Sequence, residues 1–150
     1  MLEHDLLVWN DELETGVAEI DEQHRILVNS INETNVRLNT TQVNAAVLEK
    51  ITQDLLSYAL YHFETEEELM QSLGYQEASP EDAQTHQRQH REFSATVVSV
   101  REGIKAGRLI SREDLLGFLN GWLIQHILLT DKKLGAFIVA QRALLATPPK

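Results

Sequence analysis

The sequence lacks cysteine entirely and is poor in proline and glycine. Without a thiol, its 150 residues cannot form a disulfide, a zinc–thiolate site, an iron–sulfur cluster or a cysteine nucleophile. There are 3 prolines, two of them close to the C-terminal end, and 7 glycines. Because both residue types interrupt regular structure, their scarcity predicts long, unbroken elements.

Positive charge and long apolar runs are also scarce. The 13 Lys and Arg residues against 23 Asp and Glu residues give a formal net charge of -10, which argues against binding to nucleic acids or to anionic membranes. No apolar stretch is long enough to span a bilayer, and residues 1–10 lack the basic and apolar regions of a signal peptide. We therefore expect no nucleic-acid partner, no membrane insertion and a cytoplasmic location.

Helical periodicity dominates the chain from residue 20 onward. Apolar residues recur at helical spacing over about 20–38, 41–73, 80–104 and 111–131, and a further helical stretch continues to 145. We expect Asp21, Ser79 and Ser111 to cap helix N-termini. Gly74 is expected to stop the second helix ahead of a loop over 75–80.

Four helices of this length joined by short turns predict an all-α fold, an up-down-up-down four-helix bundle. At this length the whole chain, 1–150, is expected to form one domain. Residues 1–19 are expected to form an extended N-terminal arm that lays Trp9 against the body. Residues 20–146 are expected to form the helical bundle, which ends in a short C-terminal helix. The arm carries no expected chemistry.

Five of the six histidines fall on the apolar faces of these helices. A single core histidine is better explained as structural, with its ring satisfied by a backbone carbonyl. Five converging from four helices are harder to satisfy that way, because an unpartnered polar group in a core costs roughly 2–7 kcal/mol. Neutral imidazole is the commonest metal ligand in proteins, so the pattern predicts a metal site built from His24, His62, His86, His90 and His126.

Two carboxylates belong with these imidazoles. Glu66 follows His62 by four residues and therefore lies on the same helix face. Asp131 follows His126 by five residues, which on a straight α-helix places it about 140° away. We therefore predict a π-bulge or an unwound segment near Leu128–Thr130, unless Asp131 is merely a solvated charge ahead of Lys132.

Seven such donors are too many for one ion and suit two. If both carboxylates and one solvent oxygen bridge the pair, sharing five imidazoles as three and two leaves one coordination position vacant. Imidazole and carboxylate without sulfur suit iron, zinc, copper or nickel, and a carboxylate-bridged pair in a four-helix bundle favours iron or manganese. The richness in histidine favours iron. Apolar neighbours, among them Phe63, Trp122 and Leu123, are expected to keep water away.

These motifs together resemble the hemerythrin family, specifically its bacterial members. The resemblance is carried by Trp9, by Gly16-Val17, by Ile20-Asp21-Glu22-Gln23-His24, by His62-x-x-x-Glu66, by His86-x-x-x-His90 and by His126-x-x-x-x-Asp131. It covers nearly the whole chain, and no ligand position departs from the pattern.

The resemblance implies a non-haem di-iron centre with an oxo or hydroxo bridge. It implies that His86, His90 and His126 hold a six-coordinate iron, that His24 and His62 hold the open iron, and that Glu66 and Asp131 bridge them. It also implies that Leu123 and Trp122 line a dioxygen pocket, with Phe63 nearby.

The function expected from this centre is reversible dioxygen binding for transport, storage or delivery, without enzymatic activity. Dioxygen is the expected ligand, an unidentified protein could accept it, and the chain is expected to be a monomer. Two alternatives stay open. One is an oxygen or redox sensing domain, although no attached signalling module is seen. The other is a di-iron oxidase or peroxidase, although such sites typically use about four carboxylates and two histidines.

Overall fold

The computed structural model describes residues 7–40 and 42–146 of the chain, and these residues form helices joined by short loops. The elements are, in chain order, η1 (Asp11–Leu13), α1 (Ala18–Thr40), α2 (Ala45–Leu73), α3 (Tyr75–Ala78), α4 (Pro80–Lys105), α5 (Arg112–Gln125), the π-helix η2 (His126–Asp131) and α6 (Lys132–Ala146).

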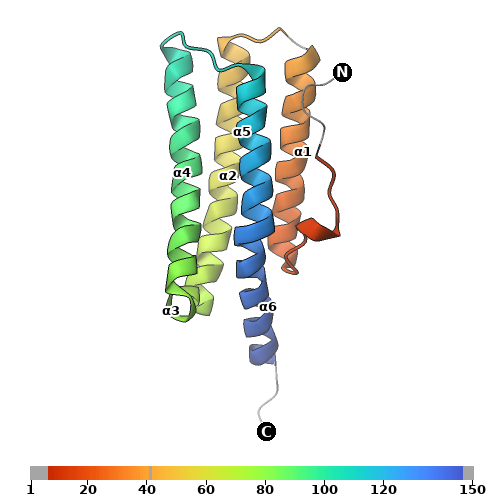
Figure 1. The fold of residues 1–150 in the computed structure, drawn as a ribbon, viewed down its shortest axis with the longest axis vertical. Coiled ribbons are helices and arrows are strands. Elements are labelled where there is room, and N and C mark those ends of the chain that lie inside the picture. Colours follow the sequence, from red (N-terminus) through yellow and green to blue (C-terminus); the bar gives the residue numbers. More distant parts are fainter. Residues whose placement is uncertain (1–6, 41, 147–150) are drawn as a thin grey trace.

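The long helices form a four-helix bundle in which neighbours in sequence run in opposite directions (Figure 1). The first three rods are α1, α2 and α4, and the fourth is the continuous run of α5, η2 and α6. This fourth rod extends past the end of the bundle, so α6 continues α5 and is not a separate C-terminal element. The expected all-α, up-down-up-down architecture is confirmed. No helix within the described ranges combines the length and hydropathy needed to cross a membrane.

Several helix ends lie where local chemistry predicted them. Gly74 adopts a left-handed conformation with φ of 78° after α2, and its N–H donates to the carbonyl of Met70. The Ser111 hydroxyl accepts from the N–H of Asp114 at 3.1 Å and caps α5. The second helix begins later than expected, at Ala45, because the Asn44 side chain caps it by accepting from Val47 N–H at 3.0 Å.

Two expectations ahead of α4 were wrong. The segment after Gly74 is not a loop: Tyr75–Ala78 forms one helical turn, α3, directly before α4. Ser79 occupies the N-cap position of α4 but its side chain makes no capping hydrogen bond, so Pro80 in the first turn provides the start signal.

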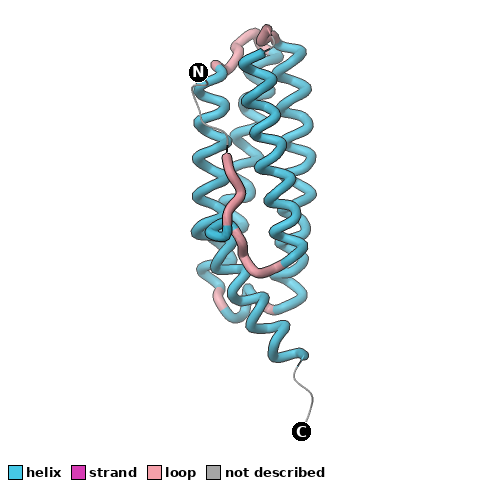
Figure 2. The backbone as a smooth tube through the Cα atoms, turned by 90° about the vertical axis from the view of Figure 1, so that its right-hand side faces the viewer, coloured by secondary structure: helices cyan, strands magenta, loops and turns pink. Residues whose placement is uncertain are grey.

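The described part of the N-terminal arm, from Leu7 onward, lies along the bundle, as Figure 2 shows for the loop running beside the helices; residues 1–6 of the predicted arm lie outside the described residues. The Leu7 N–H donates to the Asn32 side chain at 2.7 Å, and the Asn32 amide donates back to the Leu7 carbonyl at 2.7 Å. Trp9 packs on the main apolar core, and the Arg25 guanidinium lies 4.9 Å from its ring centre. These contacts confirm the expected docking of Trp9.

Asp21 was expected to cap the first helix, and this was wrong, since α1 already begins at Ala18. Its carboxylate instead holds the arm. It accepts from the N–H and the hydroxyl of Thr15, both at 2.8 Å, and from the N–H of Gly16 at 3.3 Å. The arm then crosses α6 so closely at Gly135 that a Cβ there would lie 2.6 Å from the Thr15 carbonyl oxygen. Glycine at 135 is therefore required by this close approach.

The buried side chains form two apolar clusters along the bundle. The larger cluster includes Leu27, Ala59, Phe93 and Leu123, and the smaller one includes Ile20, Met70, Ala83 and Leu134. On every long helix the predicted metal ligands come between a residue of one cluster and a residue of the other. The ligands therefore occupy a polar layer between two apolar ones.

Candidate metal centre

All four rods contribute to this polar layer, and all seven predicted ligands meet there. His24 comes from α1, His62 and Glu66 from α2, His86 and His90 from α4, and His126 and Asp131 from the two ends of η2. Each of the seven residues is at most 3% exposed. The structure therefore brings together every residue that the sequence singled out as a ligand.

The donor atoms fall into two groups that share one residue. One group is Glu66, His86, His90 and His126, and the other is His24, His62, Glu66 and Asp131, with the donor atoms of each group within 4.8 Å of one another. The shared residue is Glu66. Its Oε1 lies 3.2 Å from His62 Nε2 in one group and 3.1 Å from His90 Nε2 in the other.

Asp131 also faces both groups, with one oxygen toward each. Its Oδ2 lies 2.6 Å from the Nε2 of His24, whereas its Oδ1 lies 2.9 Å from the Nε2 of His126 and 3.1 Å from that of His86. A carboxylate whose two oxygens point to different sets of donors has the arrangement of a bridge between two ions. Both carboxylates thus stand between a set of three imidazoles and a set of two.

A π-helix makes the position of Asp131 possible. The element η2 spans His126–Asp131, so the five-residue step between these two ligands is closed by i→i+5 hydrogen bonding. The widened turn brings both side chains to the inside of the bundle, which a regular α-helix would not do. The predicted π-bulge is therefore confirmed, and the interpretation of Asp131 as a solvated charge is wrong, because Asp131 is 0% exposed.

The hydrogen bonding of the seven residues is incomplete in a way that fits metal ions. Within the described part of the chain, ten buried side-chain nitrogen and oxygen atoms have no hydrogen-bond partner, and seven of them belong to His24, His62, Glu66, His86 and Asp131. Two ligands at right angles on an ion, each about 2.1 Å away, stand about 3.0 Å apart. The 2.6–3.3 Å spacing of neighbouring donors in this layer has the same scale. The residues present therefore fit a pair of ions.

Three outer contacts fix which imidazole nitrogen faces inward. Nδ1 of His62 donates to Gln23 Oε1 at 2.7 Å, and Nδ1 of His126 donates to Gln89 Oε1 at 2.8 Å. Nδ1 of the third ring, His90, donates to a carboxylate oxygen of Glu67 at 3.0 Å. With the proton on Nδ1, each Nε2 keeps its lone pair for a metal.

The sequence interpretation missed these outer partners. Gln23, Gln89 and Glu67 each stand next to a predicted ligand in sequence, at the neighbouring positions His24, His90 and Glu66. Gln23 stood in the motif that carries the resemblance, but no role was predicted for it. For Gln89 and Glu67 adjacency was the only available signal, and it is weak, because neighbouring residues on a helix point in different directions.

In the metal-free chain the imidazoles and carboxylates shift one another's protonation strongly. Burial alone would raise the pKa of Glu66, but the His62 and His86 imidazoles outweigh burial and hold it well below its ordinary value of 4.5. The pKa of Asp131 is lowered in the same way by His126 and His24, against burial and the charge of Glu66. Burial would lower the pKa of His86, but Glu66 and Asp131 raise it to about 10.

A small apolar cavity lies directly beside the polar layer. Its volume is about 10 Å³, and the three predicted pocket residues Phe63, Trp122 and Leu123 all line it, together with Leu27 and Ala59. Leu27, Ala59 and Leu123 each stand three residues from a predicted ligand, which places the cavity one helical turn from the metal layer. Without polar partners, a space of this size does not hold a water molecule.

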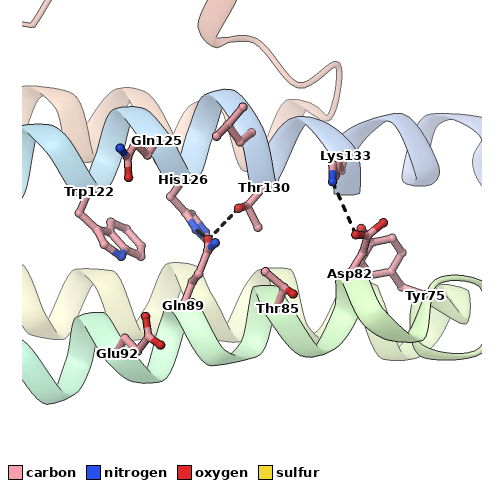
Figure 3. Close-up of a pocket in the computed structure, with 11 residues that line it drawn as sticks. Tyr75, Asp82, Thr85, Gln89, Glu92, Trp122, Gln125, His126, Thr130 and Lys133 are labelled. Atoms are coloured by element: carbon pink, nitrogen blue, oxygen red, sulfur yellow. Dashed lines mark hydrogen bonds and ion pairs between the residues drawn. The ribbon is translucent and has the colours of Figure 1, made fainter.

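Aromatic rings pack against the centre on the side of this apolar cavity. Phe63 stacks on His90 with ring centres 3.9 Å apart, and Trp122 stacks on His126 at 4.4 Å, both with planes 13° apart. Figure 3 shows the outer side of His126, where Gln89 reaches between its ring and the Thr130 hydroxyl. That hydroxyl donates to Gln89 Oε1 at 2.7 Å. The amide oxygen of Gln89 thus joins both ends of the π-helix region to α4.

Comparisons with known proteins agree with this centre. The family described as "Hemerythrin HHE cation binding domain" matches residues 15–138. The bacteriohemerythrin of Stenotrophomonas maltophilia (strain R551-3) is 34% identical over 122 residues, covering 81% of this chain and 74% of its own length. That of Pseudomonas aeruginosa (strain LESB58) is 36% identical over 121 residues, with the same coverage of each chain.

The fold has a solved counterpart. The crystal structure of a wild-type hemerythrin superposes with a TM-score of 0.77 at 26% sequence identity, covering 89% of this chain and 98% of that one. With a family match over residues 15–138, relatives above 30% identity and a shared bundle, the chain belongs to the hemerythrin family.

Proposed function

We propose that this chain binds dioxygen reversibly at a pair of iron ions, for oxygen transport, storage or delivery. Hemerythrins are oxygen-binding, iron-containing proteins, and the chain belongs to their family. One observation supports the pair above all: Asp131 turns one carboxylate oxygen to His24 and the other to His86 and His126. A single ion would leave no reason for this division.

The proposed ligands divide between the two ions as the donor atoms do. His86, His90 and His126 would hold one iron, and His24 and His62 the other. Glu66 and Asp131 would bridge them, because each has carboxylate oxygens close to both sets. The two-imidazole side has one protein donor fewer, which leaves room there for a small molecule. When bound, the two ferrous ions supply the electrons that reversible dioxygen binding requires.

The surrounding residues restrict what reaches the centre. Phe63, Trp122 and Leu123 line the dry cavity one turn away, and the surface that the cavity presents is almost wholly apolar, so it holds water poorly. An apolar molecule gives up little hydration on entering an apolar space, whereas water and ions lose hydrogen bonds there. These residues therefore select dioxygen and slow the entry of water, which limits irreversible oxidation of the iron.

The test is an optical one. Protein loaded anaerobically with ferrous iron should develop a visible band under air, and the band should disappear on deoxygenation and return over several cycles. Asp131→Asn should abolish the reversible band. The matched substitution Asp21→Asn, at a buried aspartate of α1 that holds the arm, should leave it intact. A wild-type band that never reverses, or no band at all, would refute the proposal.

An enzymatic role is the alternative, as in di-iron oxidases and peroxidases. The balance of five imidazoles against two carboxylates disfavours it, because fewer anionic ligands stabilise high-valent iron less. Stopped-flow measurement with reductant and dioxygen separates the two functions. We expect no steady consumption of dioxygen beyond one equivalent per iron pair, and rapid sustained consumption would establish an enzyme.

We further propose that the chain works as a monomer in the cytoplasm and passes dioxygen to a separate acceptor protein. Size-exclusion chromatography with light scattering should give a mass near the 17.1 kDa of one chain. A stable dimer at micromolar concentration would contradict the first part of this proposal.

A further inference from the structure

The three outer partners of the metal layer differ in charge. The Nδ1 atoms of His62 and His126 donate to neutral glutamine amides, whereas Nδ1 of His90 donates to the Glu67 carboxylate at 3.0 Å. Within residues 7–40 and 42–146, the rings of His24 and His86 have no hydrogen-bond partner on Nδ1. His90 is therefore distinguished from the other four imidazoles by an anionic acceptor on its outer nitrogen.

The ring of His90 is also held in orientation. Phe63 stacks on one face, with ring centres 3.9 Å apart and planes 13° apart, and Glu67 holds the outer edge. Nε2 then lies 3.1 Å from Glu66 Oε1, inside the group that contains His86 and His126. A carboxylate acceptor on Nδ1 draws the ring proton outward and makes Nε2 a stronger donor than a glutamine acceptor would.

We propose that Glu67 is a positioning residue that makes the three-imidazole side of the centre the more strongly electron-donating side. This inference rests on the proposed iron pair. Glu67 would hold His90 with Nε2 inward and add negative charge through the ring. Holding the ring strengthens the binding of iron in either state, whereas the added negative charge stabilises ferric iron more than ferrous iron, since the higher positive charge gains more from a stronger donor.

The position of Glu67 limits how its charge can act. Its side chain is 44% exposed and lines a surface hollow of about 530 Å³, together with Glu64, Arg91 and His90. Water in this hollow screens the long-range field of a carboxylate. The influence of Glu67 therefore travels mainly through its hydrogen bond to His90. Glu64 lines the same hollow without that contact and provides a matched control.

The experiment is a redox titration of the iron-loaded protein with three variants. Glu67→Gln keeps a hydrogen-bond acceptor but removes the charge, so ferrous iron should gain at least tenfold over ferric iron. This corresponds to a rise in reduction potential of about 59 mV for each tenfold change in a one-electron couple. Glu64→Gln should shift the potential much less. Gln89→Glu adds the missing charge at His126 and should lower the potential.

Iron affinity gives the second measurement. Competition with a chelator should show about a 10- to 100-fold loss for Glu67→Gln, because outer partners of ligating histidines contribute on this scale. Glu64→Gln should retain iron as the wild type does. If Glu67→Gln binds iron too weakly for titration, that loss supports the positioning role, and the direction of the Gln89→Glu shift then decides the role of charge.

Failure of this inference is distinguishable from failure of the proposed function. Equal potentials and equal iron affinities for Glu67→Gln and Glu64→Gln would overturn the role of Glu67, even where the wild type binds iron and dioxygen normally. An unchanged or raised potential for Gln89→Glu would overturn the part played by charge. A wild type that takes up no iron pair would instead refute the proposed function.

Discussion

Two buried aspartates differ in the hydrogen bonding of their carboxylates. They are Asp21 in the first helix and Asp131 at the end of the π-helix. The Asp21 carboxylate accepts three hydrogen bonds from Thr15 and Gly16 and so fixes the arm. Asp131 is more deeply buried, at 0% exposed, yet neither of its oxygens has a hydrogen-bond partner among the residues that the structure describes, and both face imidazole nitrogens. Where a carboxylate has a structural role, the chain itself satisfies it. Where the chain leaves a buried carboxylate without such donors, we expect a bound metal ion to satisfy it.

Removing iron should have the largest effect, because it leaves the unsatisfied layer uncompensated. A ligand at about 1,000 times its Kd stabilises the native state by about 4.1 kcal/mol. We expect the free energy of unfolding at pH 7 to be higher for the iron-loaded protein than for the metal-free protein by at least this amount. Denaturant titration with and without chelator measures the difference. Equal unfolding curves would show that the site contributes nothing to folding.

The difference in free energy of unfolding between iron-loaded and metal-free protein should widen as the pH rises. In the metal-free chain, lowered pKa values of Glu66 and Asp131 stabilise the fold above their ordinary values of 4.5 and 3.8, and this is lost in acid. The raised pKa of His86 stabilises the fold below its ordinary 6.5, and this is lost as the pH rises toward about 10. Metal-free protein should therefore be most stable between about pH 4.5 and 6.5.

Loaded protein should not lose stability in this way above pH 6.5, because its ligating imidazoles carry no proton that could be lost. Iron needs deprotonated imidazoles, so binding strengthens with pH as long as the metal-free centre still holds a proton, which for His86 extends toward about pH 10. Urea titrations of both forms from pH 4 to pH 9 would check this, with acid releasing the iron. Parallel stability curves for the two forms would contradict proton competition at the centre.

The variant Leu123→Ala tests whether the apolar cavity beside the metal ligands excludes water. Leu123 is 3% exposed and lines the apolar cavity, so truncation should cost about 2–5 kcal/mol of stability. It should also admit water and speed autoxidation of the oxygenated protein severalfold. Leu116→Ala is the matched control, since Leu116 is 1% exposed on the same helix but does not line the cavity. If both variants autoxidise at the wild-type rate, Leu123 does not exclude water.

Asp21→Ala should have a smaller effect than these changes and should leave the centre untouched. Three N–H and O–H donors lose their acceptor, which costs about 1–3 kcal/mol. Iron content and the visible spectrum should match those of the wild type. Asp54→Ala, at an exposed ion pair with Lys50, should change stability by less than about 0.5 kcal/mol. Loss of iron from the Asp21 variant would show that the arm and the centre are coupled.

Much of this centre could be predicted from the sequence, because its ligands obey helix geometry. His62 and Glu66 are four residues apart, as are His86 and His90, and such pairs share a helix face. The five-residue step from His126 to Asp131 breaks the rule, and that departure itself predicted the π-helix. Ligand spacing along one helix is local information, which a sequence carries directly.

The rest could not be predicted, because it depends on contacts between distant segments. Asp21 looked like a helix cap, yet its partners Thr15 and Gly16 belong to an arm whose path is set by the whole bundle. Gln89 belongs to a polar type normally found in solvent, and only the packing of α4 against η2 turns it to His126. Segment-to-segment contacts of this kind have no periodic signature in the sequence.

The measurement that tests the central claim most directly is the number of irons per chain. Metal-free protein titrated anaerobically with ferrous iron should bind two equivalents, and the Asp131→Asn variant should retain fewer than two after gel filtration. Asp21→Asn should retain two. Saturation of the wild type at one iron, or at none, would contradict a bridged pair in this layer.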